Sequence, residues 1–238
     1  MIETGILENY LESLLDGDRF RCRNIIEKIL QSGIPTNIVY SDLIWPMMVE
    51  IEKLARQGRI NPAEKNLSTR INRTIVDQLQ NKLPKKVCRN KKIIICCAEN
   101  ELQELGAQIM ADLFESDGWV VKFLGGGLTS DDILSYLNEF GPDLLLIYGT
   151  TPKQAPGVRR LIDTIKDVNA WPSMKIMVSG GIFNRADGLW EEIGADLFAP
   201  TATEAVQMAS SDKKPSEPEQ RTINTRKRRY KKNQVPAI

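Results

Sequence analysis

The chain has 238 residues, 42% of them apolar and 26% charged, which is typical of a soluble globular protein with one large or two modest domains. It contains no histidine, which excludes catalytic and metal-binding arrangements that depend on an imidazole. The apolar runs are too short to cross a bilayer, and the first residues lack the layout of a signal peptide. We therefore expect a cytoplasmic protein without a membrane segment.

Residues 1–83 show apolar side chains at helical spacing. Two helices are expected over residues 6–15 and 20–30, separated by Asp16-Gly17, and a third opens near Pro35 and continues to Leu54. Asn61-Pro62 is a capping residue followed by proline, which predicts the start of a fourth helix through Leu79. Short joints between these helices favour an antiparallel four-helix bundle, here taken as a cap domain.

Residues 84–91 are basic and contain few apolar side chains, so we expect a linker. Beyond it, strand and helix patterns alternate five times. This alternation predicts an α/β domain over residues 92–210 with a five-stranded, parallel, doubly wound sheet. Ligands of such sheets bind beyond the carboxyl ends of the strands, where the strand order reverses. The expected strands cover residues 92–98, 119–124, 144–149, 175–179 and 197–199.

Few residues offer chemistry of their own. The four cysteines have no CxxC spacing, so buried free thiols are favoured, with Cys97 as the alternative for a reactive thiol. Glu99, Glu101 and Glu104 cluster in one loop, but no basic partner accompanies them, and Glu104 is expected to be a solvated helix residue. The run 125–127 of three glycines is better explained as a plain loop than as a phosphate site. We therefore do not expect an enzyme.

The loop after the strand at 92–97 reads Glu101-Leu102-Gln103-Glu104-Leu105-Gly106. With the helices and βα units in this order, residues 1–209 resemble the cobalamin-binding module, a helical cap followed by a flavodoxin-like (Rossmann-like) domain. The module occurs in cobalamin-dependent methyltransferases such as methionine synthase, in corrinoid proteins and in light-sensing regulators. The family's loop has an acid, any residue, histidine, two residues and glycine. Glu101 and Gly106 match this pattern, whereas Gln103 replaces the histidine.

The resemblance implies a cofactor site that has lost its markers. In the family the histidine displaces the cofactor's own base from cobalt, and the acid orients the imidazole. Gln103 cannot replace that ligand, so no protein metal ligand is expected, and cobalamin would bind with its base still on cobalt or not at all. Tyr148 stands where the family has a small hydroxyl residue lining the slot for the nucleotide tail. Its phenol would take up the slot's volume, although Thr150 could supply a hydroxyl.

Two further parts of the resemblance concern the glycine pair and the cap. The family's pair after strand four is present as Gly180-Gly181, which permits close approach of a ligand but also a tight turn. In the cap, light-sensing members carry tryptophan, glutamate and histidine over the upper axial face. The aligned residues here are Ala55, Lys65 and Asn66. Trp45 is expected in the core, or else in the same pocket. Together these residues predict a cleft between bundle and sheet lined by Gln103, Tyr148, Thr150 and Gly180.

Residues 211–238 differ from the rest of the chain. They hold nine basic and three acidic residues, a net charge of +6, which leaves residues 1–210 at −5. Their low apolar content predicts disorder. This segment is either a solubilising extension or an attachment to nucleic acid or an acidic protein. Nonspecific phosphate contacts would then come from its basic cluster, which comprises Arg226, Lys227, Arg228, Arg229, Lys231 and Lys232.

Three functional hypotheses follow. The favoured one is a non-enzymatic regulatory or sensor protein on a cobalamin-binding fold, with a protein partner or a transcriptional complex. The first alternative is a corrinoid carrier for methyl transfer, which the overall resemblance favours. The second is a nucleic-acid-associated factor that acts through the basic tail. The sequence leaves open whether like chains associate through the bundle.

Overall fold

A computed structural model of the protein describes residues 2–211. The four predicted helices are present, but the third is made of two α-helices joined by a π-helical turn over Tyr40–Ile44. Asn61 caps the last of them as predicted, because its side chain accepts hydrogen bonds from the backbone N–H groups of Ala63 and Glu64. The helices are α1 (Thr4–Leu15), α2 (Arg19–Gln31), α3 (Thr36–Val39), α4 (Trp45–Arg56) and α5 (Pro62–Leu79), followed by a 3₁₀ turn (Gln80–Lys82).

The sheet confirms the predicted α/β class. Its five strands are all parallel and lie in the order β2-β1-β3-β4-β5, so the order reverses at β1 and β3. A ligand site is expected beyond the carboxyl ends of these two strands. The strands are β1 (Lys92–Cys97), β2 (Val120–Gly125), β3 (Leu144–Tyr148), β4 (Lys175–Ser179) and β5 (Leu197–Ala199).

The helices that follow the strands are α6 (Leu105–Ser116), α7 (Ser130–Phe140), α8 (Ala155–Val168), α9 (Gly181–Arg185), α10 (Leu189–Glu192) and α11 (Ala202–Ser210), with a 3₁₀ turn at Pro152–Gln154. Two boundaries differ from the prediction. Gln103 lies in the loop before α6 instead of in the helix, and the glycine pair belongs to the start of α9, which the sequence pattern did not predict. The loop position of Gln103 leaves its side chain beside the sheet edge.

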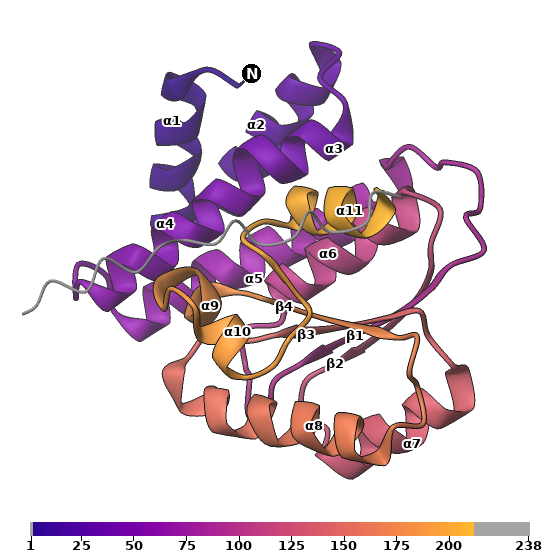
Figure 1. The fold of residues 1–238 in the computed structure, drawn as a ribbon. Coiled ribbons are helices and arrows are strands. Elements are labelled where there is room, and N and C mark those ends of the chain that lie inside the picture. Colours follow the sequence, from indigo (N-terminus) through magenta and orange to yellow (C-terminus); the bar gives the residue numbers. More distant parts are fainter. Residues whose placement is uncertain (1, 212–238) are drawn as a thin grey trace, which may run out of the picture.

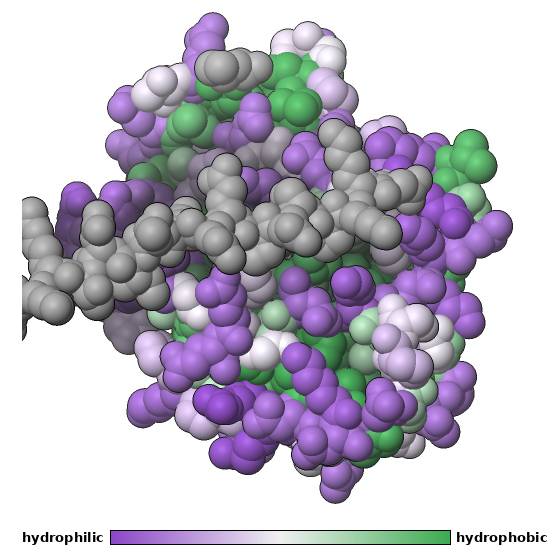
Figure 2. All heavy atoms as spheres, viewed as in Figure 1, coloured by the Kyte–Doolittle hydropathy of each residue, from purple (hydrophilic) through white to green (hydrophobic). Residues whose placement is uncertain are grey.

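The molecule is layered, with α7 and α8 below the sheet and α6, α11 and the N-terminal helices above it (Figure 1). Alternate side chains of β1 point to opposite faces of the sheet and enter two different cores. Ile93 and Cys97 belong to the core shared with the N-terminal helices, whereas Ile94 and Cys96 belong to the core under α7 and α8. Figure 2 shows that the outer surface of the α7 and α8 layer is largely hydrophilic, as expected for helices with one buried face.

The predicted linker has no helix or strand, yet it is fixed to the sheet domain. The backbone N–H of Lys86 donates to the carbonyl of Ser116 at 2.8 Å, and that of Arg89 donates to Gly118 at 2.8 Å. These bonds hold the segment along the end of α6, so it is a docked connection instead of a free tether.

Three of the four cysteines are buried as predicted, and none forms a disulfide. Cys88 is the exception, because it lies exposed in the docked linker. Burial raises the pKa of the Cys97 thiol well above its usual range, which argues against a reactive thiol there. Among residues 2–211, no helix is both long and apolar enough to cross a membrane, and no three potential metal ligands cluster. The basic tail lies outside the described residues.

Candidate ligand-binding cleft

A cleft of about 130 Å³ lies where α4 and α5 meet the carboxyl ends of β1 and β3 and the start of α9. The structure brings Gln103, Tyr148, Thr150 and Gly180 together in its wall, as the sequence predicted. The full lining comprises Trp45, Met48, Val49, Ile51, Glu52, Arg56, Lys65, Thr69, Gln103, Leu105, Tyr148, Thr150, Gly180, Gly181, Asn184 and Arg185.

Glu101 is the buried anchor of the loop on which Gln103 lies, and only 4% of it is exposed. One carboxylate oxygen accepts the backbone N–H of Gln103 at 2.7 Å, and the other accepts that of Thr150 at 2.7 Å. The carboxylate therefore joins the loop after β1 to the loop after β3. Because both oxygens bind backbone, Glu101 positions the floor of the cleft and does not itself line it.

Tyr148 ends β3, and its ring is packed against α6. A Cβ atom placed on Gly106 would lie 2.2 Å from the Tyr148 hydroxyl oxygen, so only glycine fits at that position while the phenol is there. Tyr148 is 4% exposed, and burial raises the pKa of its hydroxyl above the usual range. The phenol thus fills the space against Gly106, and Gly106 contacts the tyrosine without lining the cleft.

The glycine pair has two different roles. Gly180 has a φ of +104°, and a Cβ there would lie 2.2 Å from the carbonyl oxygen of Gly149, so close backbone packing explains it. Gly181 packs against the guanidinium of Arg185, whose Nη2 donates to the carbonyl of Thr150 at 2.5 Å. The pair therefore shapes the scaffold and supports one basic side chain at the cleft.

The cap positions from the family alignment are only partly at the cleft. Lys65 lines it and forms an ion pair with Glu52 on the neighbouring helix, whereas Ala55 and Asn66 are not among the lining residues. The helical phase explains the position of Ala55, because the side of α4 that faces the cleft carries Trp45, Glu52 and Arg56 at separations of seven and four. Trp45 is both buried in the core and part of the cleft wall, so it occupies both of the positions that the sequence offered as alternatives.

Three charged lining residues were not singled out from the sequence, namely Glu52, Arg56 and Arg185. The helical spacing from Trp45 could have indicated the first two. No sequence signal could have indicated Arg185, because its place depends on how α9 packs beside β3.

Glu104 is not the free, solvated residue that was expected. It accepts the backbone N–H of Gly126 at 2.7 Å and a hydrogen bond from Arg73 at 3.1 Å. A Cβ on Gly126 would come within 2.8 Å of the backbone oxygen of Glu101. The glycine-rich loop after β2 is thus held against the loop after β1, which supports its interpretation as a structural loop.

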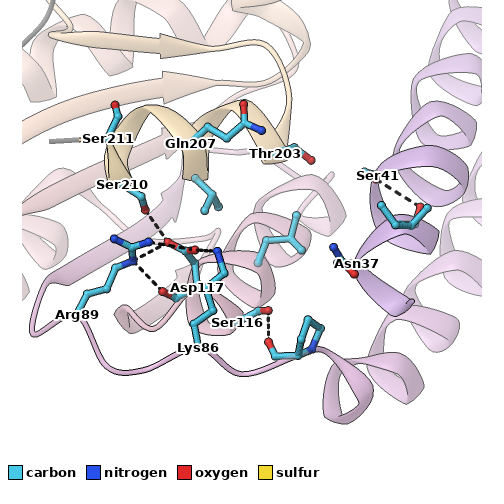
Figure 3. A pocket seen from close by; sticks show the side chains of 14 residues that line it. Asn37, Ser41, Lys86, Arg89, Ser116, Asp117, Thr203, Gln207, Ser210 and Ser211 are labelled. Carbon is cyan, nitrogen blue, oxygen red and sulfur yellow. Dashed lines mark hydrogen bonds and ion pairs between the residues drawn. The ribbon is translucent and has the colours of Figure 1, made fainter. Parts of the chain in front are cut away.

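A larger cavity, of about 430 Å³, lies away from the strand ends, between α3, the docked linker, α6 and α11. Figure 3 shows Asp117 at its centre, bonded to Lys86, Arg89 and Ser210. Although burial alone would raise the pKa of Asp117, hydrogen bonds from Lys86 and Ser210 and the nearby positive charges hold it below its usual value. Both cations of this cavity, Lys86 and Arg89, pair with the one carboxylate, Asp117, so its polar groups hold the linker and α11 in place.

A helical bundle set over the carboxyl edge of a parallel sheet, with a cleft between them, defines the class of α/β ligand-binding modules with a helical cap. The chain belongs to the B12 binding domain family, whose sheet domain matches residues 91–209, and a second B12 binding domain family matches residues 6–80.

The chain is 24% identical over 219 residues to a corrinoid protein of Desulfitobacterium hafniense (strain Y51), covering 87% of this chain and 96% of that relative. It is 23% identical over 207 residues to dimethylamine corrinoid protein 3 of Methanosarcina acetivorans, covering 86% of this chain and 95% of that one. Among solved structures, the monomethylamine corrinoid protein of Methanosarcina barkeri has the same fold, with a TM-score of 0.77 at 18% identity, over 87% of this chain and 98% of that one. These relatives favour the corrinoid-carrier hypothesis over the regulator hypothesis.

The residues present do not fit a corrinoid held by a protein histidine with its nucleotide tail inserted. Gln103 has no imidazole, both oxygens of Glu101 bind backbone, and Tyr148 fills the space against Gly106. The cleft above them is also smaller than the roughly 300–1,000 Å³ of pockets that enclose drug-sized ligands. A corrin ring could enter only if α4 and α5 moved away from the strand ends.

Proposed function

We propose that the protein is a corrinoid-binding component of a methyl-transfer system, which carries its cofactor with the cofactor's own base on cobalt and has no catalytic activity of its own. The observation that carries the proposal is the retention of both family modules in one chain, with a cleft at their junction. Nearly full-length similarity to corrinoid proteins supports it. Its partner would be a methyltransferase that donates or accepts the methyl group.

The base-on state is the part of the proposal that this chain's residues support directly. The family resemblance implies that a nucleotide tail would enter where Tyr148 stands, and the Tyr148 ring fills the space against Gly106. Cobalt would also lack an imidazole from the protein, because the whole chain has no histidine. The amide of Gln103 and the apolar wall from Trp45 would then contact the cofactor without ligating cobalt. The supposed binding to nucleic acid through residues 226–232 remains a separate prediction, and the comparisons lend it no support.

The test is a titration of the full chain with hydroxocobalamin, followed by desalting and an absorption spectrum. Retained colour with a base-on spectrum is the expected result. The Q103H/Y148S variant should bind with a base-off spectrum, because it restores an imidazole and opens the space beside Gly106. Gln57→His, at an exposed position outside the cleft, is the matched control and should stay base-on. Colourless wild-type protein would overturn the proposal.

A further inference from the structure

The charges in the cleft are unbalanced. Its lining contains one carboxylate, Glu52, and three cations, Arg56, Lys65 and Arg185. Lys65 pairs with Glu52, so the two arginines are left as an excess of two positive charges. Within residues 2–211, neither arginine forms an ion pair with a carboxylate. Both arginines are exposed, so this excess positive charge lies at the rim of a concave site, where it favours binding of an anion.

We propose that the cleft binds a small dianion, carrying phosphate or carboxylate groups, between Arg56 and Arg185. The inference goes beyond the corrinoid function proposed above and concerns the chain free of corrinoid, because both ligands would use the lining residue Gln103. Guanidinium groups suit this ligand class, because each presents several N–H donors that match two oxygens of a carboxylate or phosphate.

The two arginines come from different helices but face one site. Arg185 is oriented by packing on Gly181 and by its hydrogen bond to the Thr150 carbonyl, which uses one of its five N–H groups. Partial burial lowers the pKa of Arg185, and the positive charge of Arg56 lowers it further, although the nearby Glu52 partly offsets this; the two guanidinium groups therefore lie within electrostatic range of each other. A dianion between them would relieve this repulsion.

The size of the cleft limits the ligand. Its volume of about 130 Å³ is well below the roughly 300–1,000 Å³ of pockets for drug-sized ligands, which suits a molecule of several heavy atoms. Inorganic phosphate and a short dicarboxylate meet this limit. The amides of Gln103 and Asn184 and the hydroxyl-bearing Thr69 also belong to the lining and offer neutral hydrogen-bond partners for the remaining oxygens.

Arg56 also lies in the last turn of α4, where a cation complements the helix dipole. This effect would stabilise the helix without creating a site, so the experiment must separate a role of Arg56 in helix stability from a role in anion binding. Arg59 offers a matched control, because it is an exposed arginine three residues further along the chain and is not among the lining residues.

The test is isothermal titration calorimetry of the full chain, free of corrinoid, with inorganic phosphate and with malonate at constant ionic strength. We expect binding of at least one probe in the millimolar range or tighter, a weakening of about tenfold or more in Arg56→Gln, and less than twofold change in Arg59→Gln. The preferred probe identifies the anion as phosphate-like or carboxylate-like. An unchanged thermal unfolding midpoint of Arg56→Gln without anion would show that the weakening comes from a lost contact.

Two results would overturn the inference. One is the absence of binding for both probes in the wild type. The other is equal binding in wild type, Arg56→Gln and Arg59→Gln, which would place the anion elsewhere, such as on the basic residues 226–232. Neither result bears on the corrinoid titration, so the two proposals fail independently.

Discussion

Replacement of Asp112 by asparagine should stabilise the protein at neutral and alkaline pH. Asp112 lies on α6 against the N-terminal helices and is 4% exposed. The Tyr40 hydroxyl lies 3.0 Å from its Oδ2 and 3.0 Å from the carbonyl of Val76. One hydroxyl hydrogen cannot serve both acceptors, whereas a protonated Asp112 could donate to Tyr40 and leave the tyrosine hydrogen for Val76.

Burial raises the pKa of Asp112 to about 7, and the charges of Glu115 and Asp77 add to the rise, although the hydrogen bond from Tyr40 lowers it. At pH values between the ordinary pKa of 3.8 and the folded pKa of about 7, Asp112 in the folded chain keeps a proton that it has released in the unfolded chain. Stability contributed by this group is therefore fully present below the unfolded pKa and is lost as pH rises toward 7. At about 1.36 kcal/mol per unit, the loss is at most on the order of 4 kcal/mol.

The assay is urea unfolding of the wild type and Asp112→Asn at pH values from 4.5 to 8. The variant should gain stability relative to the wild type as pH rises, with a difference that levels off above pH 7. Asp167→Asn, at an exposed position on α8, serves as the control and should follow the wild type at every pH. If Asp112→Asn also follows the wild type, the carboxyl group is ionised in the fold at all these pH values, which contradicts the prediction.

Three other predictions concern the scaffold and the thiols. Gly106→Ala should destabilise the chain by about 1–3 kcal/mol in urea unfolding, because the new methyl group would overlap the Tyr148 hydroxyl, and the same substitution should cost little when it is added to a Tyr148→Ala variant and compared with that variant. Gly180→Ala combines a φ of +104° with an approach of 2.2 Å to Gly149, so we expect a loss of about 3 kcal/mol or more, and a variant as stable as the wild type would refute the geometry. Cys88 should be the only thiol that reacts rapidly with Ellman's reagent in the folded chain, and a Cys88→Ser variant that still reacts would contradict the burial of Cys22, Cys96 and Cys97.

The order and type of the elements could be predicted because they depend on local patterns. Apolar periodicity located the helices and strands, and Asn61-Pro62 marked the start of α5. The five βα units required a parallel sheet and hence a site at its carboxyl edge. Local patterns failed at α9, which contains only five residues and two glycines at its boundary. Such a short helix is stabilised by packing and not by its own sequence.

The sequence by itself determined that no imidazole is present and that Gln103 and Tyr148 stand at the edge of the sheet. Residue identity and the succession of strands along the chain need no coordinates. Only the tertiary structure decided that both oxygens of Glu101 bind backbone and that the Tyr148 ring requires glycine at position 106. It also decided that Arg56 and Arg185 share one cleft. Apart from the bond between Glu101 and Gln103, these relations join segments that lie tens of residues apart or more, and only packing brings such segments together.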